Sequence, residues 1–187
     1  MPRVLVVTGP SGVGKGTLIK SLCREFPDLR LSVSATTRKP RSGERDGVDY
    51  HFLSAEEFER RVAAGDFLEH ATYAGNRYGT LRDEVADGPV VLEIEVQGAR
   101  QVREALPEAT QVFIAPPSRE VLRERLVGRG TDSPEVIRAR LEQAEEELEA
   151  QGEFHHVIVN DDLSAAVQEL SDLAATIWSR PQGEART

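Results

Sequence analysis

A short stretch near the start of the chain combines glycines and a lysine in the spacing of a phosphate-binding loop. It runs Gly9-Pro10-Ser11-Gly12-Val13-Gly14-Lys15-Gly16-Thr17 and follows the apolar run Val4-Leu5-Val6-Val7. Glycines permit a turn tight enough for successive backbone N–H groups to point at a polyphosphate, and the start of a helix adds positive potential. Lys15 supplies a mobile charge for the outer phosphates. The stretch therefore predicts a nucleotide-polyphosphate site, in preference to a turn without a ligand.

The residue after Lys15 departs from the usual form of this loop. Ser or Thr commonly stands there and reaches a magnesium ion, but this chain has Gly16, with Thr17 one position later. Either Thr17 or a water molecule would fill that ligand position. We expect phosphate binding by the loop and leave its direct contact with the metal open.

A second basic segment lies between Thr36 and Gly47 and contains Arg38 and Arg41. Guanidinium groups bind phosphate through paired hydrogen bonds, so these arginines predict a second, smaller phosphate site. Tyr50 and Tyr78 are candidates to add hydroxyl donors. For either arginine alone a solvated basic turn is an equally good interpretation, and for the tyrosines packing is the commoner role.

Glu69 falls within the expected strand Phe67–Tyr73, where alternation places it on one face. Its carboxylate could accept hydrogen bonds from N1–H and the 2-amino group of guanine, a pair that adenine lacks. An exposed strand glutamate is the simpler alternative, and the sequence alone favours it.

Glu93 and Glu95 follow the apolar run Val90–Leu92 at the carboxyl end of an expected core strand. The carboxyl ends of parallel strands meet at the edge of the sheet where the phosphate loop lies. Acidic residues there commonly hold magnesium, directly or through water, so solvent exposure alone is a poor interpretation of this pair.

Arg129 and Arg140 flank a polar break in the second half of the chain. Arginines on a mobile element can balance the charge of a migrating phosphoryl group when the element closes. Surface charge is the alternative, because the segment from Glu135 is rich in Arg and Glu. The run Glu145-Glu146-Glu147 is interpreted as a solvated helix face.

Strands and helices alternate along most of the chain, which predicts an α/β fold with a parallel sheet flanked by helices. A helix is expected from the Ser54 cap to Gly65, a turn over 74–80, a short strand over Leu31–Ser34 and a last helix over Leu163–Trp178. We predict one domain with these parts: core 1–33, 88–127 and 148–180, an insertion at about 34–87, a lid at about 128–147 and a frayed tail at 181–187.

The composition is that of a globular protein with a polar surface. The chain has 187 residues, 39% hydrophobic and 29% charged, with a formal net charge of -9. This charge argues against general binding to nucleic acid or anionic membranes. The one cysteine, Cys23, cannot form an internal disulfide, so a reducing, cytoplasmic location is expected.

Taken together, the motifs resemble the guanylate kinase family over Val4 to about Leu173. The segments that carry the resemblance are Gly9–Lys15, Ser32–Arg41, Gly43-Glu44 through Asp49-Tyr50, Glu69, Gly75–Thr80, Gln97-Gly98, Ile114–Ser118, Arg129–Thr131 and Val159–Asp162. The resemblance implies a P-loop kinase fold with a GMP-binding insertion and a small lid. It also implies transfer of the terminal phosphoryl group of ATP to GMP, with ATP as co-substrate, Mg²⁺ as cofactor and purine nucleotide recycling as the role.

The resemblance implies further roles, position by position. ATP would contact Gly9 to Thr17 and, near its adenine, Asn160. Lys15, Arg129 and Arg140 would act on the transferred group, and Thr17 and Glu93 are the candidates for the metal. GMP would contact Ser34, Arg38, Arg41, Tyr50, Glu69, Tyr78, Thr80 and Glu95, with Glu44 holding the arginine loop. The family usually has aspartate at position 95 and often at position 93, so the longer glutamates here place both contacts in question.

Two other functions are compatible with the sequence. Non-catalytic guanylate-kinase-like modules bind partner peptides, but the intact Lys15, its glycines and both lid arginines argue against that class. A kinase for AMP or a pyrimidine nucleotide is the other alternative, and Glu69 together with the arginine loop favours guanine. Protein partners cannot be predicted from the sequence.

Overall fold

The computed structural model describes residues 3–73, 75–128 and 134–178, with the side chains of residues 134–136 left out. The strand β1 (Arg3–Thr8) lies at the centre of a five-stranded sheet in which every pairing is parallel. The sheet order is β2-β7-β1-β8-β9, and the other strands are β2 (Arg30–Leu31), β7 (Pro89–Glu93), β8 (Thr110–Ala115) and β9 (His156–Val159). The predicted α/β class with a parallel sheet is confirmed.

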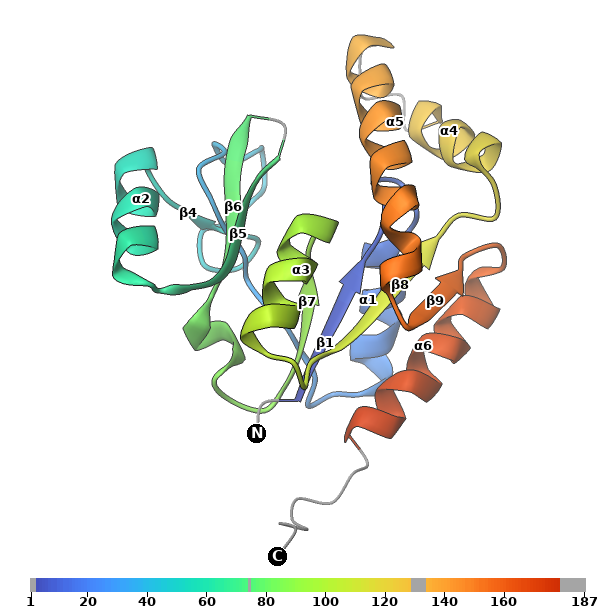
Figure 1. The fold of residues 1–187 in the computed structure, drawn as a ribbon, viewed down its shortest axis with the longest axis horizontal. Coiled ribbons are helices and arrows are strands. Elements are labelled where there is room, and N and C mark those ends of the chain that lie inside the picture. Colours follow the sequence, from blue (N-terminus) through green and yellow to red (C-terminus); the bar gives the residue numbers. More distant parts are fainter. Residues whose placement is uncertain (1–2, 74, 129–133, 179–187) are drawn as a thin grey trace, which may run out of the picture.

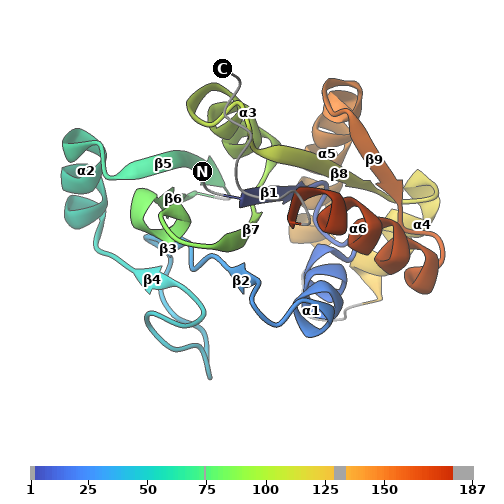
Figure 2. The same cartoon turned by 90° about the horizontal axis from the view of Figure 1, so that it is seen from below.

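Helices cover both faces of this sheet (Figure 1, Figure 2). Successive side chains of β1 point to opposite faces, because a strand has a period of two. Leu5 and Val7 pack in the layer that contains α1 (Lys15–Glu25) and α6 (Leu163–Trp178). Val4 and Val6 pack in the other layer, which contains α3 (Val96–Ala105). The apolar run before the loop is therefore buried on both sides, which fixes where the loop begins.

A second sheet belongs to the inserted segment and lies to one side of the core, near α3 (Figure 1). Its order is β4-β3-β6-β5, formed by β3 (Ala35–Thr36), β4 (His51–Phe52), β5 (Phe67–Tyr73) and β6 (Asn76–Leu81). The helix α2 (Ala55–Ala64) packs on it through Phe58, whose ring stacks on Phe67 at 4.4 Å between centroids. Ser54 Oγ accepts a bond from Glu57 N at 3.1 Å, as expected of the helix cap.

Two expectations about this segment are wrong. The predicted turn over 74–80 is wrong for residues 76–80, which belong to β6 and pair antiparallel with the preceding strand β5. Leu31–Ser34 is not one strand, since β2 ends at Leu31 and β3 begins at Ala35 in the other sheet. Residues 32–34 are the crossing between the two sheets. A 3₁₀ helix, η1 (Arg82–Val85), follows β6 and leads back to the core.

The helices α4 (Arg119–Val127) and α5 (Pro134–Glu149) extend beyond the carboxyl end of the sheet, and η2 (Ala150–Glu153) follows α5 (Figure 1). Ser118 caps α4 by accepting a bond from Val121 N at 3.2 Å. Residues 129–133, within the predicted lid, lie outside the described residues. Among the helices that the structure describes, none is long and apolar enough to cross a bilayer.

Candidate active site

Two glycines of the loop Gly9–Thr17 are required by their backbone conformation and close packing. Gly9 has φ of 136°, and a Cβ there would lie 2.2 Å from the carbonyl oxygen of Ile114. Gly14 has φ of 101° and directly precedes α1, and no side chain caps the first N–H groups of that helix. L-residues with side chains rarely adopt such φ values. The loop therefore leaves the N-terminus of α1 uncapped by side chains at the end of β1, as an anion-binding loop requires.

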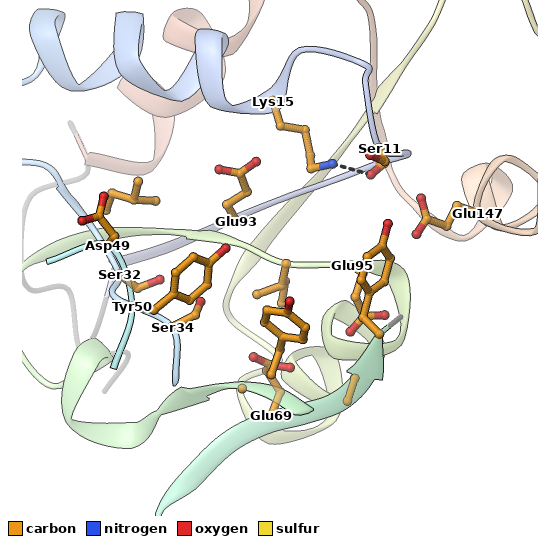
Figure 3. Close-up of a pocket in the computed structure, with 17 residues that line it drawn as sticks. Ser11, Lys15, Ser32, Ser34, Asp49, Tyr50, Glu69, Glu93, Glu95 and Glu147 are labelled. Atoms are coloured by element: carbon orange, nitrogen blue, oxygen red, sulfur yellow. Dashed lines mark hydrogen bonds between the residues drawn. The ribbon is translucent and has the colours of Figure 1, made fainter. Parts of the chain in front are cut away.

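Lys15 folds back over this loop. Its Nζ donates to the carbonyl oxygens of Gly9 at 2.6 Å and Pro10 at 3.1 Å, and Figure 3 shows the ammonium group facing the cavity. The charge is thus already held beside the backbone N–H groups that would receive phosphate, and a short movement of a flexible side chain transfers it to a ligand.

Asn160 supports the loop Gly9–Thr17 through a hydrogen bond to its backbone. Its side chain is buried, and Nδ2 donates to Val13 O at 2.8 Å. A Cβ at Gly14 would lie 2.6 Å from the same nitrogen. Asn160 therefore holds the loop backbone, and the predicted contact with adenine stays a prediction.

A cavity of about 360 Å³ lies between the loop, the carboxyl ends of the core strands and the inserted sheet (Figure 3). Residues from all three parts line it: Gly9, Ser11, Lys15, Leu31, Ser32, Ser34, Asp49, Tyr50, Glu69, Ala71, Tyr73, Tyr78, Gly79, Glu93, Ile94, Glu95 and Glu147. The structure thus brings the loop lysine, the predicted base-reading Glu69 and the predicted phosphate ligands Ser34, Tyr50 and Tyr78 to one cavity.

The arginine loop is held by Glu44. Arg38 Nη2 donates to Glu44 Oε1 at 2.9 Å, and the backbone N of Arg41 donates to Glu44 Oε2 at 2.7 Å. The bond from Arg38 is the main cause that lowers the pKa of Glu44. The Arg38 guanidinium also lies 5.2 Å from the centroid of the Tyr50 ring. Arg38 therefore lies next to a cavity-lining tyrosine. Neither Arg38 nor Arg41 lines the cavity itself, and the Arg41 side chain is exposed.

Glu69 is buried and is not an exposed strand glutamate. Its exposure is 3%, and Oε1 accepts a bond from Thr80 Oγ1 at 2.7 Å. Burial raises its pKa to about 7, against the opposing effect of the Thr80 bond. The sequence alone favoured exposure because α3, which covers β5, is distant in the chain. The predicted pairing of Glu69 with Thr80 at one site is consistent with this geometry.

Gln101 on α3 holds β5 in position through two hydrogen bonds to its backbone, and no sequence pattern indicates this role. Its Nε2 donates to His70 O at 2.8 Å and its Oε1 accepts from His70 N at 3.1 Å. This pair of bonds places Glu69 against the first turn of α3, where Gly98 has no side chain to obstruct it.

Glu95 caps α3. Its oxygens accept bonds from Gln97 N at 2.7 Å and Gly98 N at 2.9 Å, and burial raises its pKa. The carboxylate also approaches the position of Glu69, since a Cβ on Gly98 would lie 3.1 Å from Glu95 Oε1. Glu95 therefore lies at the N-terminus of α3, beside Glu69.

Glu93 and Thr17 line a second cavity of about 340 Å³ along the loop, together with Lys15 and Gly16. A Cβ on Gly16 would lie 3.8 Å from Glu93 Oε2, so the carboxylate faces the residue that replaces the usual serine. Among the described residues no group of three acidic, histidine or cysteine side chains could hold a metal alone. One carboxylate and one hydroxyl fit Mg²⁺, which keeps several waters and shares phosphate oxygens.

The predicted lid, at about 128–147, is described in part. Burial raises the pKa of Tyr73, and Glu147 adds to the rise. Arg140 on α5 lies near enough to this tyrosine to oppose the increase in part. Arg129 lies outside the described residues. The interpretation of Glu145-Glu146-Glu147 as a solvated face is wrong for Glu147, which is 8% exposed and lines the main cavity. A run of three charges spans more than one side of a helix, so one member can turn inward.

Comparisons with known proteins agree with this geometry. Residues 1–176 match the family model described as guanylate kinase. A guanylate kinase of Synechococcus sp. (strain CC9311) is 59% identical over 173 residues, covering 90% of this chain and 91% of that protein. One of Streptomyces coelicolor is 51% identical over 181 residues, covering 94% and 92%. The crystal structure of guanylate kinase from Anaplasma phagocytophilum has a TM-score of 0.73 and 33% identity, covering 95% of this chain and 86% of that one.

Proposed function

The chain belongs to the guanylate kinase family and is an ATP-dependent GMP phosphotransferase, and we propose the following division of roles among its residues. The observation that carries the assignment is that Lys15 and the buried Glu69 line one cavity from opposite sides (Figure 3). Donor phosphates at the loop and an acceptor base at Glu69 would then place the two nucleotides end to end.

The acceptor GMP binds in the part of the cavity formed by the inserted sheet. Its guanine edge donates N1–H and 2-amino hydrogens to Glu69, with Thr80 holding the carboxylate and Glu95 beside it. A base without these donors would leave a buried carboxylate unpaired, which disfavours it strongly. The phosphate is held by Ser34, Tyr50, Tyr78 and Arg38, with Arg41 joining from its exposed position and Glu44 fixing both arginines.

The donor ATP binds with its phosphates on the backbone of Gly9 to Thr17 and on Lys15. Glu93 and Thr17 are the residues that would hold Mg²⁺, which when bound neutralises charge on the outer phosphates. Asn160 holds the loop backbone through its bond to Val13 O, and we propose that it also lies near the adenine.

Transfer proceeds in line, without a covalent enzyme intermediate. An oxygen of the GMP phosphate attacks the terminal phosphorus of ATP, and the bond to the ADP leaving oxygen breaks. Lys15 balances charge that develops on the transferred group, and Arg140 and Arg129 join it from the lid. A cytoplasmic location is proposed on the single cysteine of the chain.

The test compares the two substrates in one variant. Glu69→Gln keeps the size of the side chain and replaces an acceptor oxygen with a donor, so the KM for GMP should rise by about tenfold or more. The KM for ATP should change by less than about twofold. An equal effect on both substrates would contradict the base-reading role. Matched Glu56→Gln, at an exposed position on α2, should change neither value.

A further inference from the structure

Ser32 lines the cavity and carries a buried hydroxyl group without a hydrogen-bond partner in the described structure. The residue is 8% exposed, and its Oγ is covered. Removing a hydroxyl from water without replacing its hydrogen bonds is unfavourable. The described structure has four side chains with such an atom, Ser32, Thr8, Arg77 and Trp178, and Ser32 alone among them lines the cavity.

The backbone around Ser32 is fixed on both sides. Ser32 N donates to Val91 O at 2.9 Å, and this bond anchors Ser32 to the core sheet. His51 N donates to Ser34 O at 2.9 Å, and this bond anchors Ser34 to the inserted sheet. Between them, Val33 N donates to Glu84 Oε2 at 3.0 Å. The crossing segment is thus held in place before any ligand arrives.

Ser32 and Ser34 face the same cavity. Residues two apart in an extended segment point to the same side, and both serines are in the lining set. Figure 3 shows them on one wall beside Tyr50, with Glu93 nearby toward the loop. Ser32 therefore lies on the side of the cavity where the acceptor phosphate is placed.

We propose that Ser32 donates a hydrogen bond to a phosphate oxygen of the acceptor nucleotide, adjacent to the contact made by Ser34. The inference rests on the proposed placement of GMP. The proposal requires the hydroxyl to rotate about χ1 to another staggered position, from which Oγ points toward the cavity. Because Oγ has no partner in the ligand-free protein, no existing hydrogen bond must break when phosphate arrives, and a charged acceptor strengthens the new bond.

The test is calorimetric titration of GMP and of guanosine, which lacks the phosphate, into wild-type protein and three variants. Ser32→Ala removes the hydroxyl in question, and Ser34→Ala removes its proposed neighbour on the phosphate. Thr8→Val is the matched control, because it removes another buried hydroxyl without a partner, at a position outside both cavities. Thermal unfolding without ligand accompanies each titration.

Ser32→Ala should weaken GMP binding about tenfold to a hundredfold and leave guanosine binding and the melting temperature of the free protein undiminished. Thr8→Val should leave GMP binding unchanged. GMP binding by Ser32→Ala within about twofold of wild type would overturn the inference, as would an equal loss for guanosine or a lower melting temperature that reveals a structural partner. If Ser34→Ala is also without effect, the phosphate placement in the proposed function fails too. A loss confined to Ser34→Ala overturns the Ser32 assignment alone.

Discussion

The carboxylate of Glu69 occupies the space that a side chain at Gly98 would need. A Cβ on Gly98 would lie 2.5 Å from Glu69 Oε2, closer than atoms of these kinds approach. Gly98 is in the first turn of α3, and Glu69 is on β5 of the inserted sheet. The absence of a side chain at Gly98 therefore leaves room for the buried carboxylate of Glu69, and this contact joins α3 of the core to the inserted sheet.

Gly98→Ala should displace Glu69 while keeping the helix. Alanine favours a helix over glycine by about 1 kcal/mol, so the fold is retained, but the carboxylate must move by several tenths of an ångström or more. We expect the KM for GMP to rise about tenfold and the KM for ATP to stay within about twofold, in a steady-state assay. Gly152→Ala is the control, because nothing lies within 4 Å of a Cβ there. Unchanged use of GMP by Gly98→Ala would contradict the assignment.

GMP binding should depend on pH through Glu69. Burial raises its pKa to about 7, and the guanine edge requires the ionised form as acceptor. Affinity should therefore fall as pH decreases, by about tenfold between pH 8 and pH 6, because most of the carboxyl is protonated at the lower pH. The GMP phosphate titrates in the same range, so the relevant quantity is the difference between wild type and Glu69→Gln. Parallel pH profiles for the two proteins would exclude Glu69 as the titrating acceptor.

Lys15→Met should lower turnover strongly while leaving the folding stability of the protein nearly unchanged. The ammonium bonds the loop carbonyls in the free protein and balances charge in the transfer step. Removal of one such group typically lowers kcat by about 10²–10³-fold. Arg24→Met removes a positive charge from an exposed position at the other end of the same helix and should stay near wild type. Near-normal turnover by Lys15→Met would be incompatible with the proposed mechanism.

Glu147→Gln should stabilise the protein at high pH. Burial raises the pKa of Glu147 from an ordinary 4.5 to about 7, so the folded state holds the proton of this carboxyl more tightly than the unfolded state does. The contribution of the protonated Glu147 carboxyl to the free energy of unfolding is complete below pH 4.5 and is lost as pH rises through about 7. The difference in unfolding free energy between Glu147→Gln and wild type, measured with urea, should be larger at pH 8 than at pH 5 by up to about 3 kcal/mol in favour of the variant. The exposed Glu146→Gln should show no such pH-dependent gain, and equal changes in both would refute the effect of burial.

The features that could be predicted from the sequence are those set by neighbouring residues. The loop Gly9–Thr17 follows from its glycines and the preceding apolar run, and the helix over Leu163–Trp178 has the predicted bounds. The cap at Ser54 also depends on a residue only three positions away. Such signals are local, so one sequence carries them in full.

The features that could not be predicted depend on elements distant in the chain. Glu69 is buried because Gln101 on α3 holds β5 against the core. Glu147 is buried because it faces from α5 into the cavity of about 360 Å³. The strand β6 is an exception, because it pairs with the strand directly before it in the chain; there Gly75 and Asn76 indicate a turn, but the antiparallel pairing with β5 begins at Asn76. The resemblance to a known family placed Glu69 and Thr80 together, whereas strand alternation alone left the glutamate exposed.

The central claim is that one cavity presents a guanine nucleotide to ATP, and a coupled assay of phosphoryl transfer tests it most directly. Purified protein is supplied with ATP, Mg²⁺ and GMP, AMP, dTMP or UMP in parallel. The account predicts turnover with GMP and a kcat/KM at least about a hundredfold lower for the other three acceptors. No transfer to GMP, or equal use of AMP, would contradict it.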